Sequence, residues 1–109
     1  MAKIIETSLP TDGKPCILIE GATILHIDDV KEGVSAHTGR PWKLRYVNLA
    51  INRGEGFPSD YVRVCFRNEA CDLFASKNFA EKDMASLYVQ FRITGGQWPR
   101  NEIEVITII

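Results

Sequence analysis

The stretch Trp42–Arg67 alternates apolar and polar residues, and this pattern constrains the fold more than any other feature of the chain. Every second residue is apolar over Val47–Ile51 and again over Val62–Phe66, and the segment 54–58 between them contains two glycines and a proline. Such alternation is typical of half-buried β-strands, and glycine with proline is typical of a turn. We therefore predict two consecutive strands, each with one face in the core.

The other face of these two strands carries arginine and aromatic residues beside small polar groups. Planar rings can stack on nucleobases, and guanidinium groups can pair with phosphate. From Arg40 to Arg53 the chain has four basic residues and no acidic one, although the net charge is −1. A binding surface depends on local charge rather than on the total. The pattern therefore predicts a face that binds single-stranded nucleic acid.

Three further strands are expected around this pair. Residues 1–15 form an N-terminal arm or loop, whose beginning is either an edge strand or a frayed end, and Lys31–Pro41 forms a loop rich in glycine. Gly21 predicts a sharp bend in a long first strand, because glycine removes a side-chain clash at a barrel corner. The last strand is apolar on both faces, which predicts a central place in a sheet or cover by another subunit. The predicted strands are Cys16–Val30, Leu44–Arg53, Tyr61–Arg67, Leu87–Thr94 and Ile103–Ile109.

One helix is expected after the third strand. Asn68 is a favoured N-cap residue, Glu69 and Asp72 place negative charge in the first turn, and the helix is predicted to end near Lys77. The order is then three strands, a helix and two strands. This order predicts an all-β domain over residues 16–109, a five-stranded OB-fold Greek-key barrel with one short helix between strands 3 and 4.

Composition excludes several classes of function. The chain of 109 residues has three cysteines and no C-x-x-C pair, so neither a disulfide framework nor a zinc ribbon is expected. Cys65, on the polar face of its strand, is the one thiol expected to be exposed. His26 and His37 lie far apart without a catalytic partner, so we expect no enzyme, no cofactor and no metal. No membrane span or signal peptide is present, which predicts a soluble cytoplasmic protein.

Three segments carry a resemblance to a known family. Val47–Arg53 resembles the second-strand segment of bacterial and phage single-stranded DNA-binding proteins, in which an apolar-Leu-Ala-apolar pattern runs into a polar loop. Asp60–Phe66 is similar to the following strand of that family, which opens with an aromatic residue and carries an arginine two residues later. Ile17–Gly21 resembles the family's opening strand. The resemblance implies an OB-fold that coats single-stranded DNA.

The resemblance also implies roles for single residues. Tyr61 matches a base-stacking aromatic, Arg63 matches a basic residue on the same strand, and Trp98 and Trp42 lie near further stacking positions. Two features depart from the family. No flexible linker with an acidic tip follows Ile109, so we expect a reduced version, as a phage or mobile element would carry, without acidic-tail recruitment of repair proteins. The helix also begins with acidic residues, which would repel a passing nucleic-acid strand.

The sequence thus predicts a non-catalytic single-stranded DNA-binding protein, a dimer or tetramer assembled through its last or first strand. Two alternatives remain open. The same face could bind protein, as an adaptor in a replication or conjugation complex, or it could bind RNA. The predicted nucleic-acid-binding residues are Trp42, Lys43, Arg45, Arg53, Tyr61, Arg63, Arg67, Tyr88, Arg92, Trp98 and Arg100.

Overall fold

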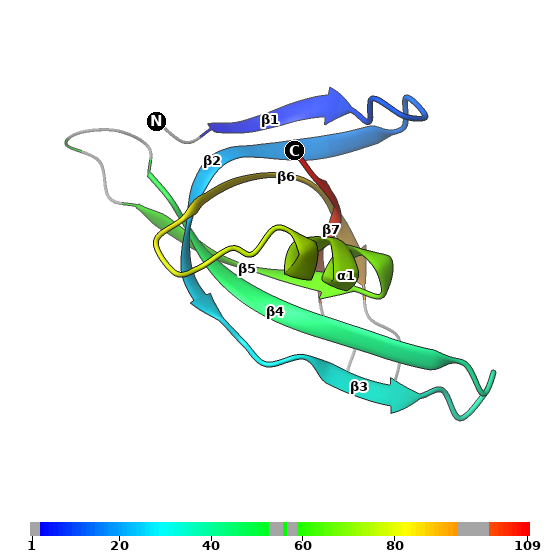
Figure 1. Cartoon of the computed structure of the whole chain (residues 1–109). Helices are drawn as coiled ribbons and strands as arrows, with labels where there is room; N and C mark the ends of the chain where they lie inside the picture. Colours follow the sequence, from blue (N-terminus) through cyan, green and yellow to red (C-terminus); the bar gives the residue numbers. More distant parts are fainter. Residues whose placement is uncertain (1–2, 53–55, 57–58, 94–100) are drawn as a thin grey trace.

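The chain forms a β-barrel with one helix (Figure 1). The computed structural model describes residues 3–52, 56, 59–93 and 101–109. The helix α1 follows the strand Asp60–Arg67 and precedes the strand Met84–Ile93, which is the predicted place between the third and fourth barrel strands. Its bounds and those of the strands are β1 Lys3–Ser8, β2 Pro15–Ile27, β3 Lys31–Val34, β4 Pro41–Ile51, β5 Asp60–Arg67, α1 Glu69–Ser76, β6 Met84–Ile93 and β7 Asn101–Ile108.

Five of these strands close into a barrel. Their order around it is β2, β6, β7, β5 and β4, and β4 pairs back to β2 to complete the ring. Neighbours are antiparallel, except that β5 and β7 run parallel. A closed five-stranded barrel with a helix between its third and fourth strands has the layout of an OB-fold. The predicted fold class is therefore confirmed.

The first barrel strand, β2, is bent as predicted. Gly21 has a φ of 69°, which L-residues with a side chain rarely adopt. The pairing register between β2 and β6 shifts between Ile19 and Ala22, on either side of this glycine. Residues 15–20 of β2 pair with β1, residues 17–23 pair with β6, and residues 23–27 pair with β4. The bend therefore allows one strand to close the barrel on both sides.

Two strands lie outside the barrel. β1 pairs antiparallel with β2 only, so the arm begins as an edge strand rather than as a frayed end. The prediction of a loop over Lys31–Pro41 was wrong in part, because Lys31–Val34 forms β3 and pairs with the beginning of β4. Four residues are too few for alternation to be recognised. The β3–β4 hairpin projects away from the barrel at the lower right of Figure 1.

The helix packs on the barrel through Ala70, Cys71 and Phe74, which join the buried core. The Phe74 ring lies 4.6 Å from that of Phe66, between ring centroids. Asn68 precedes the helix as predicted, but its side chain makes no capping hydrogen bond. Its Oδ1 instead accepts a hydrogen bond from the backbone N–H of Lys43 (3.1 Å), which ties β4 to the start of α1.

The last strand, β7, occupies a central position in the sheet. It pairs with β6 on one edge and with β5 on the other, so the backbone of β7 is hydrogen-bonded on both edges within the barrel. The predicted central place in the sheet is therefore found, and cover by another subunit stays a prediction. Within the described residues, no helix is long and apolar enough to cross a membrane.

Candidate functional site

A groove of about 400 Å³ crosses the outer face of β4, β5 and β7, and we refer to it as the strand-face groove. Side chains that alternate away from the core form this face, because successive residues of a strand point to opposite sides. Tyr46 of β4, Arg63 of β5 and Glu102 of β7 meet here. The groove is lined by Lys31, Tyr46, Arg63, Cys65, Asn101, Glu102 and Ile103.

Cations lie close to the Tyr46 ring in this groove. The guanidinium carbon of Arg63 is 4.0 Å from the ring centroid, and Lys31 Nζ is 5.7 Å from it. Both distances fall within the range of a cation–π interaction. Arg63 Nη2 also donates a hydrogen bond to Asp28 Oδ2 at 3.2 Å. The predicted residue Arg63 is thus held between an aromatic ring and a carboxylate.

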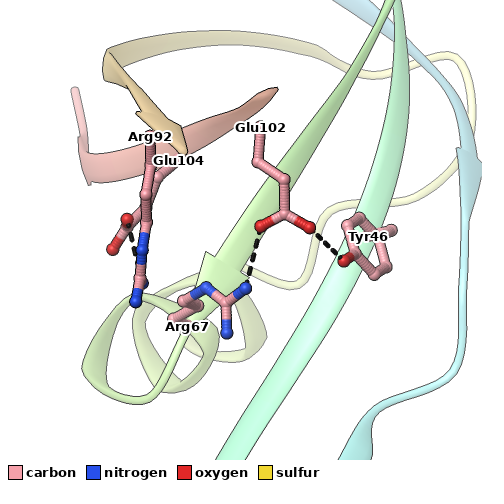
Figure 2. A network of polar contacts seen from close by, with 5 residues as sticks. All are labelled: Tyr46, Arg67, Arg92, Glu102 and Glu104. Atoms are coloured by element: carbon pink, nitrogen blue, oxygen red, sulfur yellow. Dashed lines mark hydrogen bonds and ion pairs between the residues drawn. The ribbon is translucent and has the colours of Figure 1, made fainter. Parts of the chain in front are cut away.

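A buried carboxylate, Glu102, lies beside Tyr46 and Arg67 (Figure 2). Glu102 is only 8% exposed and accepts a hydrogen bond from Tyr46 Oη at 2.7 Å and another from Arg67 Nη2 at 2.8 Å. Burial by itself would lower the pKa of Arg67, but the hydrogen bond to Glu102 and the nearby negative charge raise that pKa above its ordinary value. Glu102 therefore fixes the positions of Tyr46 and Arg67, and Arg67 keeps its charge.

Tyr61 is the predicted stacking residue with the most open position. Its exposed fraction is 74%, and it lies two residues from Arg63 on the same face of β5. Cys65 follows on that face, and the prediction that its thiol is exposed was wrong, because Cys65 is 1% exposed. It pairs with Tyr46 on β4 and with Glu104 on β7, whose larger side chains flank it. Burial raises the pKa of the Cys65 thiol.

Lys43 and Arg45 alternate with Tyr46 along β4 and so lie on the opposite, helix-facing side of the strand. Lys43 Nζ forms an ion pair with Asp72 of α1, and this hydrogen bond raises the pKa of Lys43. The guanidinium carbon of Arg45 lies 5.8 Å from the centroid of the Phe74 ring. These two predicted residues therefore contact the helix and do not line the strand-face groove.

The other predicted residues are dispersed. Trp42 packs against Gly33 in the β3–β4 hairpin. Tyr88 lies half-buried on β6, opposite Leu18 of β2 and Thr107 of β7. Arg92 Nη1 donates to Glu104 Oε2 at 3.3 Å (Figure 2). The predictions for three residues fall outside the described part of the chain, namely Arg53, Trp98 and Arg100.

Sequence reasoning missed several residues of the groove. Tyr46 could have been found, because alternation places it with Asn48 on the polar face of β4, and Asn48 pairs with Arg63 of β5. Lys31 was assigned to a loop, and only the pairing of β3 with β4 brings it to this face. Glu102 had no recognisable signal, since its partners lie 35 and 56 residues away in the chain.

Neither histidine lies in the groove. His26 Nε2 is 2.8 Å from Asp28 Oδ1, and Nδ1 is 3.5 Å from Glu81 Oε1, so it is surrounded by carboxylates near the end of β2. His37 lies in the exposed turn between β3 and β4. In the part of the chain that the structure describes, no three His, Cys, Asp or Glu side chains gather in a way that could hold a metal ion.

Comparison with models of known protein families gives no match, and no curated protein matches the sequence.

Proposed function

We propose that this protein is a non-catalytic binder of single-stranded nucleic acid, with DNA as its ligand, and that the strand passes over the outer face of β4 and β5. The observation that carries the proposal is the exposed Tyr61 beside the Arg63–Tyr46 stack. In OB-folds, the face formed by the second and third barrel strands binds oligonucleotides, and these strands are β4 and β5 here. An open aromatic ring beside a cation on that face suits a base and its phosphate.

The contacts divide between the base and the backbone of the ligand. Tyr61 offers its ring for stacking, and Lys31 and Arg63 offer positive charge to phosphate. Asp28 competes for Arg63, but the side chain of Arg63 is 55% exposed and that of Asp28 is 30% exposed. An ion pair this open to water contributes little, so a phosphate can replace the carboxylate. The buried pair of Arg67 with Glu102 stays intact and holds Tyr46 in place.

Pairing with carboxylates limits how many phosphates the described cations can neutralise. Lys31 and Arg63 are the cations that line the groove, whereas Arg67 and Arg92 are paired with Glu102 and Glu104. For a single strand the logarithm of the affinity falls with the logarithm of salt by about 0.7 per phosphate neutralised. Two cations thus predict a slope of about −1.4 for the logarithm of the affinity against the logarithm of the salt concentration. Because so few phosphates are neutralised, stacking provides most of the affinity.

A fluorescence anisotropy titration with labelled oligo-dT tests the proposal. Tyr61→Ala is expected to weaken binding by about tenfold, because a stack contributes about 1–3 kcal/mol per base. Met84→Ala removes an apolar side chain that is 63% exposed at the start of β6, and it serves as the control. Arg63→Gln should reduce the salt slope by about 0.7, whereas Lys14→Gln in the β1–β2 turn should not. If neither Tyr61→Ala nor Arg63→Gln changes the binding of oligo-dT, the proposal that this face binds the ligand is wrong.

The ion pairs favour a second candidate, in which the same face binds a protein. Phosphate binding is strongest where arginines are free, yet Arg63, Arg67 and Arg92 each have a carboxylate partner. An adaptor with this face would bind no oligonucleotide at low salt. The third hypothesis is RNA binding. It is favoured if the protein binds oligo-U as tightly as oligo-dT.

The oligomeric state remains a prediction. Both edges of β7 are paired within the barrel, so an assembly through the backbone edge of this strand would require the barrel to open. The outer edge of β1 pairs with no other described strand, and this edge is where a strand from another copy could add. Sedimentation velocity would give the state directly.

A further inference from the structure

A second cleft lies on another part of the molecule, between the β3–β4 hairpin and the start of α1. Its volume is about 640 Å³, larger than that of the strand-face groove. We call it the hairpin–helix cleft. The residues that matter for its chemistry are Glu32, Val34, Pro41, Trp42, Glu69 and Asp72.

Part of this cleft is apolar surface in contact with solvent. Val34 is 66% exposed, and Pro41, its pairing partner on β4, is exposed as well. Trp42 is 39% exposed, and its ring lies so close to Gly33 that an added Cβ there would be 2.5 Å from Cζ2. The glycine thus leaves room for the indole ring at the wall of the cleft. An apolar side chain of a ligand would find contact area here.

The charge of the cleft is negative. Lys43 is its one cation among the described lining residues, and it is already paired with Asp72. Glu32 and Glu69 form no hydrogen bond or ion pair with any described residue. Glu32, which lies opposite Lys43 in the β3–β4 pairing, and Glu69 thus border the exposed valine and proline without a hydrogen bond or ion pair to any described residue. This surface repels a polyanion, and it fits a ligand that brings positive charge together with an apolar side chain.

From this combination we infer that the hairpin–helix cleft binds a basic peptide segment of a partner protein. An apolar side chain of the segment contacts Val34 and Pro41, and flanking lysine or arginine side chains pair with Glu32 and Glu69. The inference does not depend on the strand-face groove, because the two sites share no lining residue. It also gives a role to the acidic start of α1, which does not fit nucleic-acid binding.

The test uses the full chain and a labelled synthetic peptide in which lysines flank one leucine within a glycine–serine background. Fluorescence anisotropy at low salt should detect binding of this probe, and the same peptide with glutamates in place of the lysines should not bind. The double variant Glu32→Gln with Glu69→Gln should weaken binding about fivefold, since two exposed ion pairs are lost. Val34→Ser should weaken it as well, because it removes the apolar contact.

A matched double variant, Glu6→Gln with Glu20→Gln, changes the net charge equally on β1 and β2, away from the cleft. It should leave the affinity for the probe unchanged. The inference is overturned if this control weakens binding as much as the cleft variant, if the acidic peptide binds equally well, or if no basic probe binds. A self-association that the cleft variant abolishes would overturn it too, because a second copy would then be the occupant. Oligo-dT titrations of the same variants keep this result separate from the proposed function.

Discussion

Replacing Glu102 with glutamine tests how much the buried carboxylate stabilises the fold. The Glu102 side chain is 7% exposed and that of Arg67 is 25% exposed. Glutamine keeps the shape and one acceptor oxygen, so it can accept from Tyr46 or from Arg67 but loses the charge. A hydrogen bond to a charged group contributes about 1.5–3 kcal/mol. Because a quarter of Arg67 remains in water, we expect Glu102→Gln to reduce the free energy of unfolding by about 2 kcal/mol.

Glu104→Gln is the matched control, since it removes the same charge two residues further along β7, on the same face of the strand. Its partner Arg92 is 48% exposed, and their contact is 3.3 Å, so the expected loss is about 0.5 kcal/mol. Urea denaturation followed by circular dichroism measures both losses. In thermal melts the shifts should be about 8 °C and about 2 °C, because 1 kcal/mol corresponds to about 4 °C in a domain of this size.

Equal losses for the two variants would refute the reasoning, since they would mean that burial does not distinguish the two carboxylates. A second readout follows from the proposed function. Arg67, once released from Glu102, becomes available to phosphate, so the salt slope for oligo-dT should become steeper by about 0.7 in Glu102→Gln. Arg92 lies on β6, outside the outer face of β4 and β5 over which the strand is proposed to pass, so the slope should change less in Glu104→Gln.

Three further predictions concern the hairpin and the thiols. Gly33→Ala should reduce the free energy of unfolding by about 1 kcal/mol, because the new methyl group displaces the Trp42 ring, and the loss should vanish in a Trp42→Ala background. Burial raises the pKa of Cys65 and of Cys71, so their contribution to stability is complete at neutral pH and is lost as the pH rises through their folded-state pKa. The urea midpoint should therefore fall above about pH 9, and less steeply in Cys65→Ala. All three thiols are buried, so Ellman's reagent should react with them quickly only after urea is added.

Local patterns predicted the barrel because each acts over a few neighbouring residues. Alternation located β4, β5 and β6, since one face of each strand is buried in a single core, whereas β2 and β7 were recognised by their apolar content. Gly21 predicted the bend in β2, because the bend requires a φ that glycine adopts readily. The position of α1 followed from the switch from alternation to helical spacing after Arg67.

The site could be predicted only in part, because it depends on which strands become neighbours. Arg63 was found, since alternation places it on the outer face with Tyr61. Its partner Asp28 is 35 residues away in the chain, and no local pattern joins the two. The basic residues therefore looked free in the sequence, whereas the fold pairs several of them with carboxylates. Lys43 is one of them, because it alternates with Tyr46 on β4 and forms an ion pair with Asp72 of α1.

The parallel pairing of β5 with β7 has a consequence during synthesis. A ribosome releases the barrel strands in the order β2, β4, β5, β6, β7, so the strand that joins β5 to β6 is the last to emerge. Until residues through Ile108 have left the exit tunnel, the edges of β5 and β6 that pair with β7 have unpaired backbone groups. A nascent chain can thus form the β2–β4–β5 meander early, but the ring can close only after β7 has emerged.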